Sequence, residues 1–182
     1  MYIKTDYILM ALHLLAWIIF VGLGIEAGAL ITQMVVTLTQ APDVANRVWK
    51  IVDLAALHNS HPAHYVTLST LIIIATVLKA IMFYVIVKLF LGKHLNLLKP
   101  YNETTQKFVG NLGYLSLGIG LFTSWGAKFT GQLEKDGISL PDLSTLKLAG
   151  GDVWLFMGVI LLIIAFIFKK GVELQNENDL TI

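Results

Sequence analysis

Long apolar segments constrain the fold of this chain more than any other feature of its sequence. A membrane-spanning helix needs about 20 mostly apolar residues, and four segments reach or approach that length. They cover residues 7–38, 65–91, 108–129 and 153–168. We therefore predict an all-α fold in which residues 1–182 form one domain, a four-transmembrane-helix bundle with a cytoplasmic tail at residues 169–182.

The four segments differ in character. The second is uniformly apolar around residues 71–77, whereas glycines and hydroxyl side chains interrupt the third. Lys169 and Lys170 end the fourth. The first continues well past Phe20, whereas a cleaved signal peptide has a short apolar stretch. It is therefore predicted to be a retained helix.

The amino-acid composition excludes several classes of function. Charged residues make up 14% of the chain, against about a quarter in soluble domains, so little of its surface is suited to water. The absence of cysteine excludes disulfides, thiolate metal sites, a cysteine nucleophile and covalent haem attachment. The net charge of +1 predicts no direct binding to nucleic acid. The sequence has no phosphate loop, dinucleotide fingerprint, serine-hydrolase motif or zinc-protease motif, which favours a non-enzymatic protein without a cofactor.

Two of the connections carry structural signals. Residues 42–57 place apolar side chains at helical spacing, with Pro42 suited to a first turn and Trp49 to an anchor among the headgroups. We expect a short amphipathic helix there, lying along the membrane interface in the first outer loop. Residues 131–151 contain turn signals and predict a polar loop with room for a short hairpin.

The distribution of lysine and arginine predicts the orientation. With an even number of spans, both termini share one side of the membrane. That side carries seven basic residues near the helix ends: Lys4, Lys88, Lys93, Lys99, Lys107, Lys169 and Lys170. The other side carries five: Arg47, Lys50, Lys128, Lys135 and Lys147. We therefore expect cytoplasmic termini and a basic cytoplasmic connection between the second and third helices.

A few ionisable residues lie where lipid is expected. Each costs about 2.5–3.5 kcal/mol at the centre of a spanning helix and is a functional candidate by default. Lys79 lies in the middle of the second segment and needs a partner inside the bundle. Glu26 is the acidic residue well inside the first segment, within reach of Lys79 or Lys128 if the helices tilt. His13 can hydrogen-bond Lys79 or the backbone. Structural ion pairs and a structural histidine are favoured over an ion pathway.

Three histidines, His58, His61 and His64, follow one another at spacings of three. Imidazoles are able to bind Zn²⁺ or Cu²⁺. Positions three and six residues apart, however, drift around a helix, and Pro62 interrupts the geometry. Interfacial histidines or a pH-sensitive outer surface are therefore favoured over a metal site.

Small residues mark two packing faces. Gly24 and Gly28 form a Gly-x-x-x-Gly pattern in the first segment. The third segment has a stripe of small residues formed by Gly113, Ser116, Gly120 and Ser124. Such residues let transmembrane helices approach closely. Because both stripes lie in the outer half and both helices run in the same direction, we expect the first and third helices to pack together. A homodimer through Gly24 and Gly28 is the alternative.

The C-terminal end carries the most distinctive string of the sequence, Lys170-Gly-Val-Glu-Leu-Gln-Asn-Glu-Asn-Asp-Leu-Thr-Ile182. A fourth helix ending in this tail resembles the bacterial membrane proteins of domain-of-unknown-function family 2975, and so does the Lys99-Pro100-Tyr101 turn. The resemblance implies a four-helix protein of the bacterial inner membrane with no assigned reaction. It also implies a cytoplasmic regulator as partner, because genes of the family often neighbour a small helix-turn-helix regulator.

Three functional hypotheses follow. The leading one is a non-enzymatic membrane protein that senses or signals, its tail and basic connection contacting a cytoplasmic partner. The tail residues expected to make that contact are Glu173, Glu177, Asp179 and Leu180. The second is a small transporter or ion-coupled carrier that uses Glu26 and Lys79. The third is metal or cofactor binding by His58, His61 and His64.

Overall fold

The structure is a computed structural model in which residues 2–40, 51–91 and 102–179 are described. Every regular element in this part of the chain is a helix, as predicted. The four long helices are α1 (Tyr2–Thr39), α4 (Pro62–Leu91), α5 (Glu103–Lys135) and α6 (Gly151–Asp179). A short helix, α3 (Ala55–Ser60), precedes α4.

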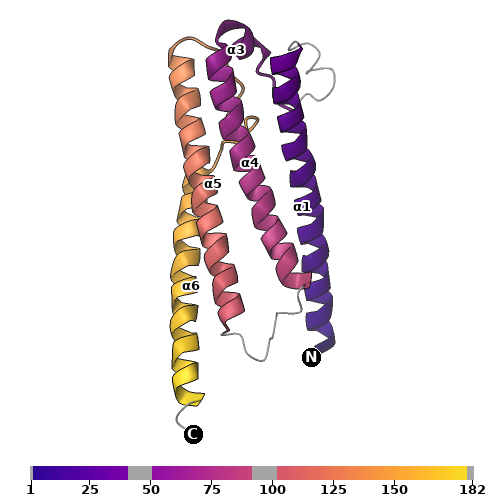
Figure 1. Cartoon of the computed structure of the whole chain (residues 1–182), viewed down its shortest axis with the longest axis vertical. Coiled ribbons are helices and arrows are strands. Elements are labelled where there is room, and N and C mark those ends of the chain that lie inside the picture. Colours follow the sequence, from indigo (N-terminus) through magenta and orange to yellow (C-terminus); the bar gives the residue numbers. More distant parts are fainter. Residues whose placement is uncertain (1, 41–50, 92–101, 180–182) are drawn as a thin grey trace.

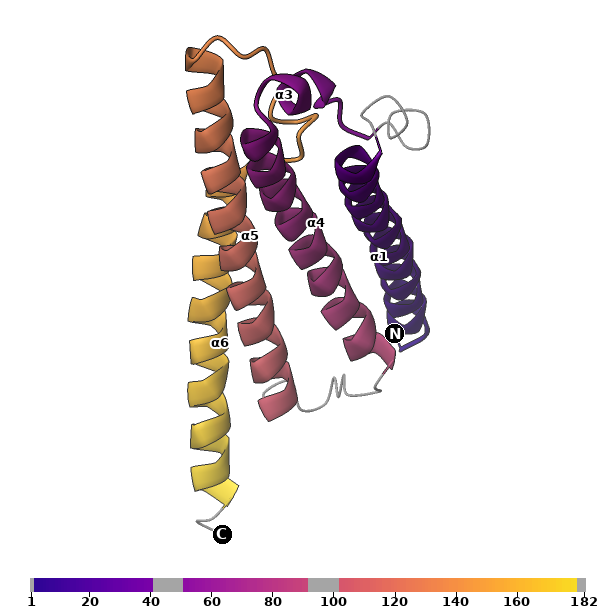
Figure 2. The same ribbon diagram turned by 45° about the horizontal axis from the view of Figure 1, so that its top comes forward.

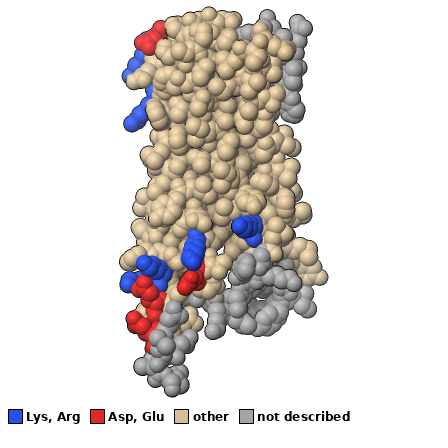
Figure 3. Space-filling view, in the orientation of Figure 1, with Lys and Arg blue, Asp and Glu red and all other residues tan. Residues whose placement is uncertain are grey.

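Three of the long helices are long and apolar enough to cross a membrane. The qualifying stretches are Tyr7–Thr39 of α1, Pro62–Leu91 of α4 and Gly151–Gln175 of α6. On the face seen in Figure 3, charged side chains gather toward the two ends and leave a band without them between. A bilayer requires such an apolar band, flanked by polar zones at the headgroups. These are the features of an integral membrane protein.

The observed elements refine the predicted boundaries. Each predicted segment lies within a long helix, and α6 continues through most of the predicted tail to Asp179. Of the amphipathic helix predicted at residues 42–57, residues 42–50 lie outside the described part of the chain. Residues 51–54 are not helical, and α3 begins only at Ala55. The predicted polar loop is shorter than expected, because α5 extends to Lys135.

The four long helices form a row in chain order rather than a closed bundle. α1 packs on α4, α4 on α5, and α5 on α6, as both ribbon views show (Figures 1 and 2). Among the described residues, α1 makes no packing contact with α5 or α6. The start of α1 and the end of α6 lie at the same end of the molecule, called here the terminal end.

Glycines allow the closest approach in this row, between α5 and α6. A Cβ atom added to Gly120 would lie 2.7 Å from Cγ of Leu155, and one added to Gly113 would lie 2.8 Å from Cδ2 of Leu162. α6 contributes a glycine in return, since a Cβ at Gly158 would lie 2.8 Å from Leu117. The leucines of each helix therefore fill the space that the glycines of the other leave open.

The predicted pairing of the first and third helices is wrong. The small residues of α5 face α6 at Gly113 and Gly120, while the Ser116 hydroxyl lies 3.8 Å from Sδ of Met82 in α4. A Cβ at Gly24 or Gly28 would have no atom within 4 Å, so this face of α1 is open in the described structure. The physical reason is that α4 lies between α1 and α5 and separates the two stripes.

We predict that Gly120→Ala destabilises the protein while Gly24→Ala does not. The new methyl group at position 120 meets the Leu155 side chain and its backbone nitrogen at 2.8 Å, which forces the helices apart. Overpacking of this kind costs roughly 1–3 kcal/mol. Unfolding in mixed detergent micelles, followed by circular dichroism, measures the difference. Gly24→Ala controls for the effect of alanine in a helix, and equal stabilities of the two variants would contradict the interlocked interface.

Candidate functional site

The connecting segment (residues 136–150) joins α5 to α6 by turning back into the molecule. α5 ends in a glycine turn: Gly137 has a φ of +85°, and the N–H groups of Gly137 and Ile138 donate to the carbonyls of Glu134 and Leu133. This is the Schellman pattern of a helix end. Gly151, where α6 starts, lies against Ser124, about 16 Å back along α5 at 1.5 Å per residue. Figure 1 shows α6 beginning partway along α5.

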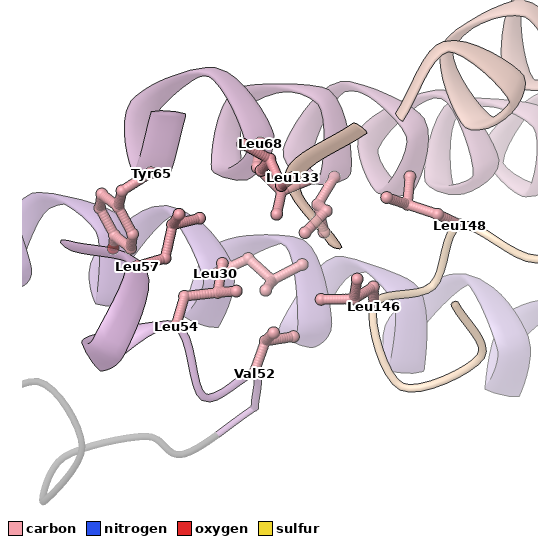
Figure 4. Close-up of a cluster of buried hydrophobic side chains, with 10 residues drawn as sticks. Leu30, Val52, Leu54, Leu57, Tyr65, Leu68, Leu133, Leu146 and Leu148 are labelled. Atoms are coloured by element: carbon pink, nitrogen blue, oxygen red, sulfur yellow. The ribbon is translucent and has the colours of Figure 1, made fainter. Parts of the chain in front are cut away.

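Two leucines anchor the connecting segment between the helices. Leu146 and Leu148 are almost fully buried, and a Cβ at Gly126 of α5 would lie 2.7 Å from Leu148. Figure 4 shows the cluster that they join. It consists of Leu30, Val52, Leu54, Leu57, Tyr65, Leu68, Ile72, Leu133, Leu146 and Leu148. Burial of these two leucines holds the segment against the helices, while the other residues from 142 to 150 are exposed.

A tight turn precedes the second leucine. The carboxylate of Asp142 accepts hydrogen bonds from the backbone N–H and the hydroxyl of both Ser144 and Thr145. These bonds, that of the Ser144 hydroxyl first, lower the pKa of Asp142 to about 2. Lys147 then repeats the geometry that ends α5: its N–H donates to the Ser144 carbonyl, and the N–H of Leu148 donates to the Leu143 carbonyl.

Lys147 occupies the position in this turn that usually belongs to glycine. Its φ is +61°, and it is the non-glycine residue with a positive φ in the described chain. A left-handed conformation at such a residue costs roughly 1–3 kcal/mol and persists only where its surroundings impose it. Burial of Leu146 and Leu148 on either side is one such constraint. The Lys147 side chain and its carbonyl group provide two further constraints.

The polar cluster (Glu26, Lys79 and Lys147) links three elements. Nζ of Lys147 lies 3.2 Å from Oε1 of Glu26 in α1. Nζ of Lys79 in α4 donates to the Lys147 carbonyl oxygen at 3.2 Å. The Glu26 side chain is 24% exposed and that of Lys147 45%. The ion pair therefore ties α1 to the connecting segment, while Lys79 holds the backbone of the same residue.

The cluster brings together two of the polar residues that the sequence singled out. Lys79 and Glu26 meet through Lys147, which sequence analysis had placed only among the outer basic residues. Lys128 is not in this site: it lines a separate hollow with Trp125 and Leu155, and no ion pair between Lys128 and Glu26 occurs in the described structure.

His13 does not contact Lys79, contrary to one of the two expectations for it. Its Nε2 accepts a hydrogen bond of 2.9 Å from Nε1 of Trp17, and its ring stacks on Phe90 at 5.4 Å. These contacts join α1 to the last turns of α4 near the terminal end. His13 therefore has a structural role in helix packing.

The three outer histidines make ring contacts instead of converging on one point. His61 and His64 stack at 5.3 Å, His58 meets Tyr65 edge-on at 5.0 Å, and His64 lies against Phe129. No group of three His, Asp or Glu residues in the described ranges is arranged to hold a metal ion. The metal-site hypothesis is therefore not supported, because Pro62 starts a new helix between the imidazoles.

The tail residues are placed only in part. Glu173 forms an ion pair with Lys170 at 2.7 Å, within its own helix, and Lys107 pairs with Glu103 at 3.1 Å. Glu177 is exposed. The side chains of Asp179 and Leu180, like Lys93 and Lys99 of the basic connection, lie outside the described residues.

Comparison with known proteins identifies a family. The sequence model of a family described as "Protein of unknown function (DUF2975)" matches residues 39–182, which is most of the chain. No curated protein and no solved structure matches. The match includes Lys79 and Lys147 but begins after Glu26.

We predict that Glu26→Gln loosens the connecting segment. Removing the carboxylate leaves the Lys147 ammonium without its partner on α1, so the segment loses the ion pair that ties it to that helix. Hydrogen–deuterium exchange of the full chain in nanodiscs should show backbone amides of residues 143–150 exchanging roughly tenfold faster or more. The control is Glu103→Gln, which breaks an exposed ion pair at the terminal end.

A second variant separates charge from backbone strain. Lys147→Gly removes the ammonium but supplies the residue best suited to a positive φ. If the ion pair holds the segment in place, the backbone amides of residues 143–150 exchange faster in Lys147→Gly than in the unaltered protein, as they do in Glu26→Gln. Slower exchange than in the unaltered protein would show that the turn alone fixes the segment.

We also predict that Ser144→Ala raises the pKa of Asp142 from about 2 toward its ordinary value, because the Ser144 hydroxyl is the main cause of the depression. A depressed carboxyl pKa stabilises the folded state above the unfolded-state pKa, and this contribution disappears as the pH falls through about 2. Carboxyl-carbon NMR of aspartate-labelled protein measures the titration. An unchanged Asp142 titration would contradict the hydrogen-bonded turn.

Proposed function

The chain belongs to the DUF2975 family of unknown function, and we propose that it is a non-enzymatic signalling protein of the bacterial inner membrane. In this proposal the connecting segment reports the state of the outer half of the protein through α6. The end of α6 passes that state to a cytoplasmic partner. The observation that carries the proposal is the strained Lys147, held by Glu26 and Lys79.

The direction of the helices supports four spans. α4 and α6 are both apolar enough to span a membrane and run toward the terminal end (Figure 1). The chain must therefore cross back between them, and α5 runs in that opposite direction. Glycines, serines and threonines lower the hydropathy of α5, and many of them are buried against its neighbours rather than exposed to lipid. The excess of lysine and arginine at the terminal end supports cytoplasmic termini.

Lys147 distinguishes the connecting segment from an ordinary turn. The same Schellman geometry ends α5, and there the left-handed position is Gly137, which carries no strain. A lysine at position 147 keeps the strain and adds an ion pair with α1. Strained residues cluster at active sites, ligand clamps and switch regions. We infer that the segment has a second arrangement, released when the Glu26–Lys147 pair opens.

α6 provides the route from this segment to the cytoplasm. Gly150, with a φ of +74°, joins the connecting segment directly to the first turn of α6. α6 is then one continuous helix of 29 residues ending at Asp179. A rigid helix transmits a displacement of its first turn to its last. Exposed Leu174 and Glu177 near that end are the surface proposed for the partner.

The geometry supports transport less well. A cavity lined by Leu30, Gln33 and Met34, with α4 opposite, has a volume of about 20 Å³, which is room for roughly one water molecule. Neither Glu26 nor Lys79 lines it. Signalling is favoured because it needs a two-state element rather than a path for a substrate. The open face at Gly24 and Gly28 supports a second copy of the chain as a further partner.

The signalling proposal is tested by a distance across the terminal end. The chain lacks cysteine, so Leu91→Cys and Leu174→Cys place spin labels only at these two exposed sites of α4 and α6. Pulsed electron paramagnetic resonance in nanodiscs measures their separation. We expect Glu26→Gln and Lys147→Gly each to shift or broaden the distance distribution, while Glu134→Gln, which removes an exposed carboxylate near the end of α5, leaves it unchanged.

The exchange and distance measurements together separate structure from signalling. Faster amide exchange in the connecting segment with an unchanged distance between the labels would overturn the route through α6. The polar cluster would then have a purely structural role. A shift caused equally by Glu134→Gln would show that the labelled end responds to any lost charge, which also contradicts the proposal.

A further inference from the structure

A further hollow, of about 370 Å³, lies between α4 and α5 near the terminal end. Both helices contribute a lysine to it, Lys88 from the last turn of α4 and Lys107 from the second turn of α5. The full lining is Tyr84, Val85, Lys88, Leu89, Thr104, Lys107, Phe108 and Asn111. It is thus a cleft with cationic and apolar parts, and it is separate from the polar cluster.

The charge in this cleft favours an anion. Lys88 and Lys107 bring two ammonium groups, and Thr104 and Asn111 add a hydroxyl and an amide that can donate hydrogen bonds. Lys107 pairs with Glu103, but both side chains are about 70% exposed, and such pairs contribute about 0–1 kcal/mol. Lys107 can therefore exchange this partner for another anion at little cost. The first turn of α5, where Thr104 lies, is also the positive end of the helix dipole.

The apolar walls of the cleft, and its position near the lipid headgroups, indicate which anion binds there. Val85, Leu89 and Phe108 form walls that an inorganic ion does not need, whereas a glycerol backbone and acyl chains fit against them. Within the described residues, the stretch of α4 that is apolar enough to span a membrane runs to Leu91, and Lys88 lies in its last turn. Lysines at that position lie where lipid headgroups begin, and Tyr84 suits the same interface. Basic pockets between transmembrane helices bind anionic headgroups.

We propose that the cleft between α4 and α5 binds the phosphate of an anionic phospholipid through Lys88 and Lys107, with acyl chains along Val85, Leu89 and Phe108. The site does not depend on the signalling proposal, because it needs only a membrane-embedded chain. Glu103 limits its affinity, since its carboxylate competes with the lipid phosphate for Lys107.

Native mass spectrometry of the full chain in detergent tests the proposal, with phosphatidylglycerol and phosphatidylcholine as probes. We expect tighter binding of phosphatidylglycerol. Lys88→Ala and Lys107→Ala should each weaken it roughly fivefold, which corresponds to about 1 kcal/mol per lysine. Glu103→Gln should strengthen it, an effect that damage to the fold would not produce. Lys128→Ala, at the opposite end, is the matched control and should change nothing.

Three results would overturn the proposal. Equal binding of the two lipids would remove the requirement for an anionic headgroup. An equal loss in Lys128→Ala and Lys88→Ala would indicate attraction to overall charge rather than to this cleft. Displacement of the bound lipid by millimolar inorganic phosphate would show that the cleft selects the free anion and not the lipid.

Discussion

Hydrogen bonding of backbone groups away from water is the constraint on which this structure depends. In hydrocarbon an unsatisfied N–H or C=O group costs several kcal/mol, so chain segments cross as helices or stay buried in protein. The connecting segment is not helical, and several of its polar groups are satisfied by bonds within it or to α4. Asp142 accepts from the turn, paired helix-end bonds close it, and Lys79 donates to the Lys147 carbonyl. Lys79 is thus tolerated in α4 because it completes the backbone of another element.

The polar cluster also explains how α1 stays attached to the rest of the protein. α1 packs on α4 alone among the long helices, and little of its membrane-spanning stretch is buried. Leu30 joins the hydrophobic cluster, Gln33 donates to the Val52 carbonyl at 2.6 Å, and Glu26 binds Lys147. Packing of leucines is nonspecific in lipid, where the surroundings are equally apolar. Directional polar contacts therefore fix the register of α1 against the connecting segment.

The sequence predicted elements and polar positions better than it predicted partners. Helix existence follows from local apolar length, and Lys79 and Glu26 stand out because charge is rare in such stretches. Their common partner, Lys147, follows Lys79 by 68 residues. Its position depends on burial of Leu146 and Leu148, which no local pattern encodes. The glycine stripe of α5 likewise indicated a packing face but not the neighbour, since close approach is compatible with any adjacent helix. Because α6 is the neighbour of α5 in the row, the leucines of α6 pack against the glycines of α5.

The late start of α6 sets its apolar stretch at a different height from that of α4. Because Gly151 lies about 16 Å back along α5 at the usual helical rise, the apolar stretch of α6 is displaced toward the terminal end relative to that of α4. A hydrocarbon layer thicker than the overlap of the two stretches leaves part of one stretch outside it. Mismatch of this kind costs fractions of a kcal/mol per Å and is relieved by helix tilt or local thinning. In the proposed signalling function, membrane thickness would therefore load α6 and, through Gly150, the strained turn at Lys147.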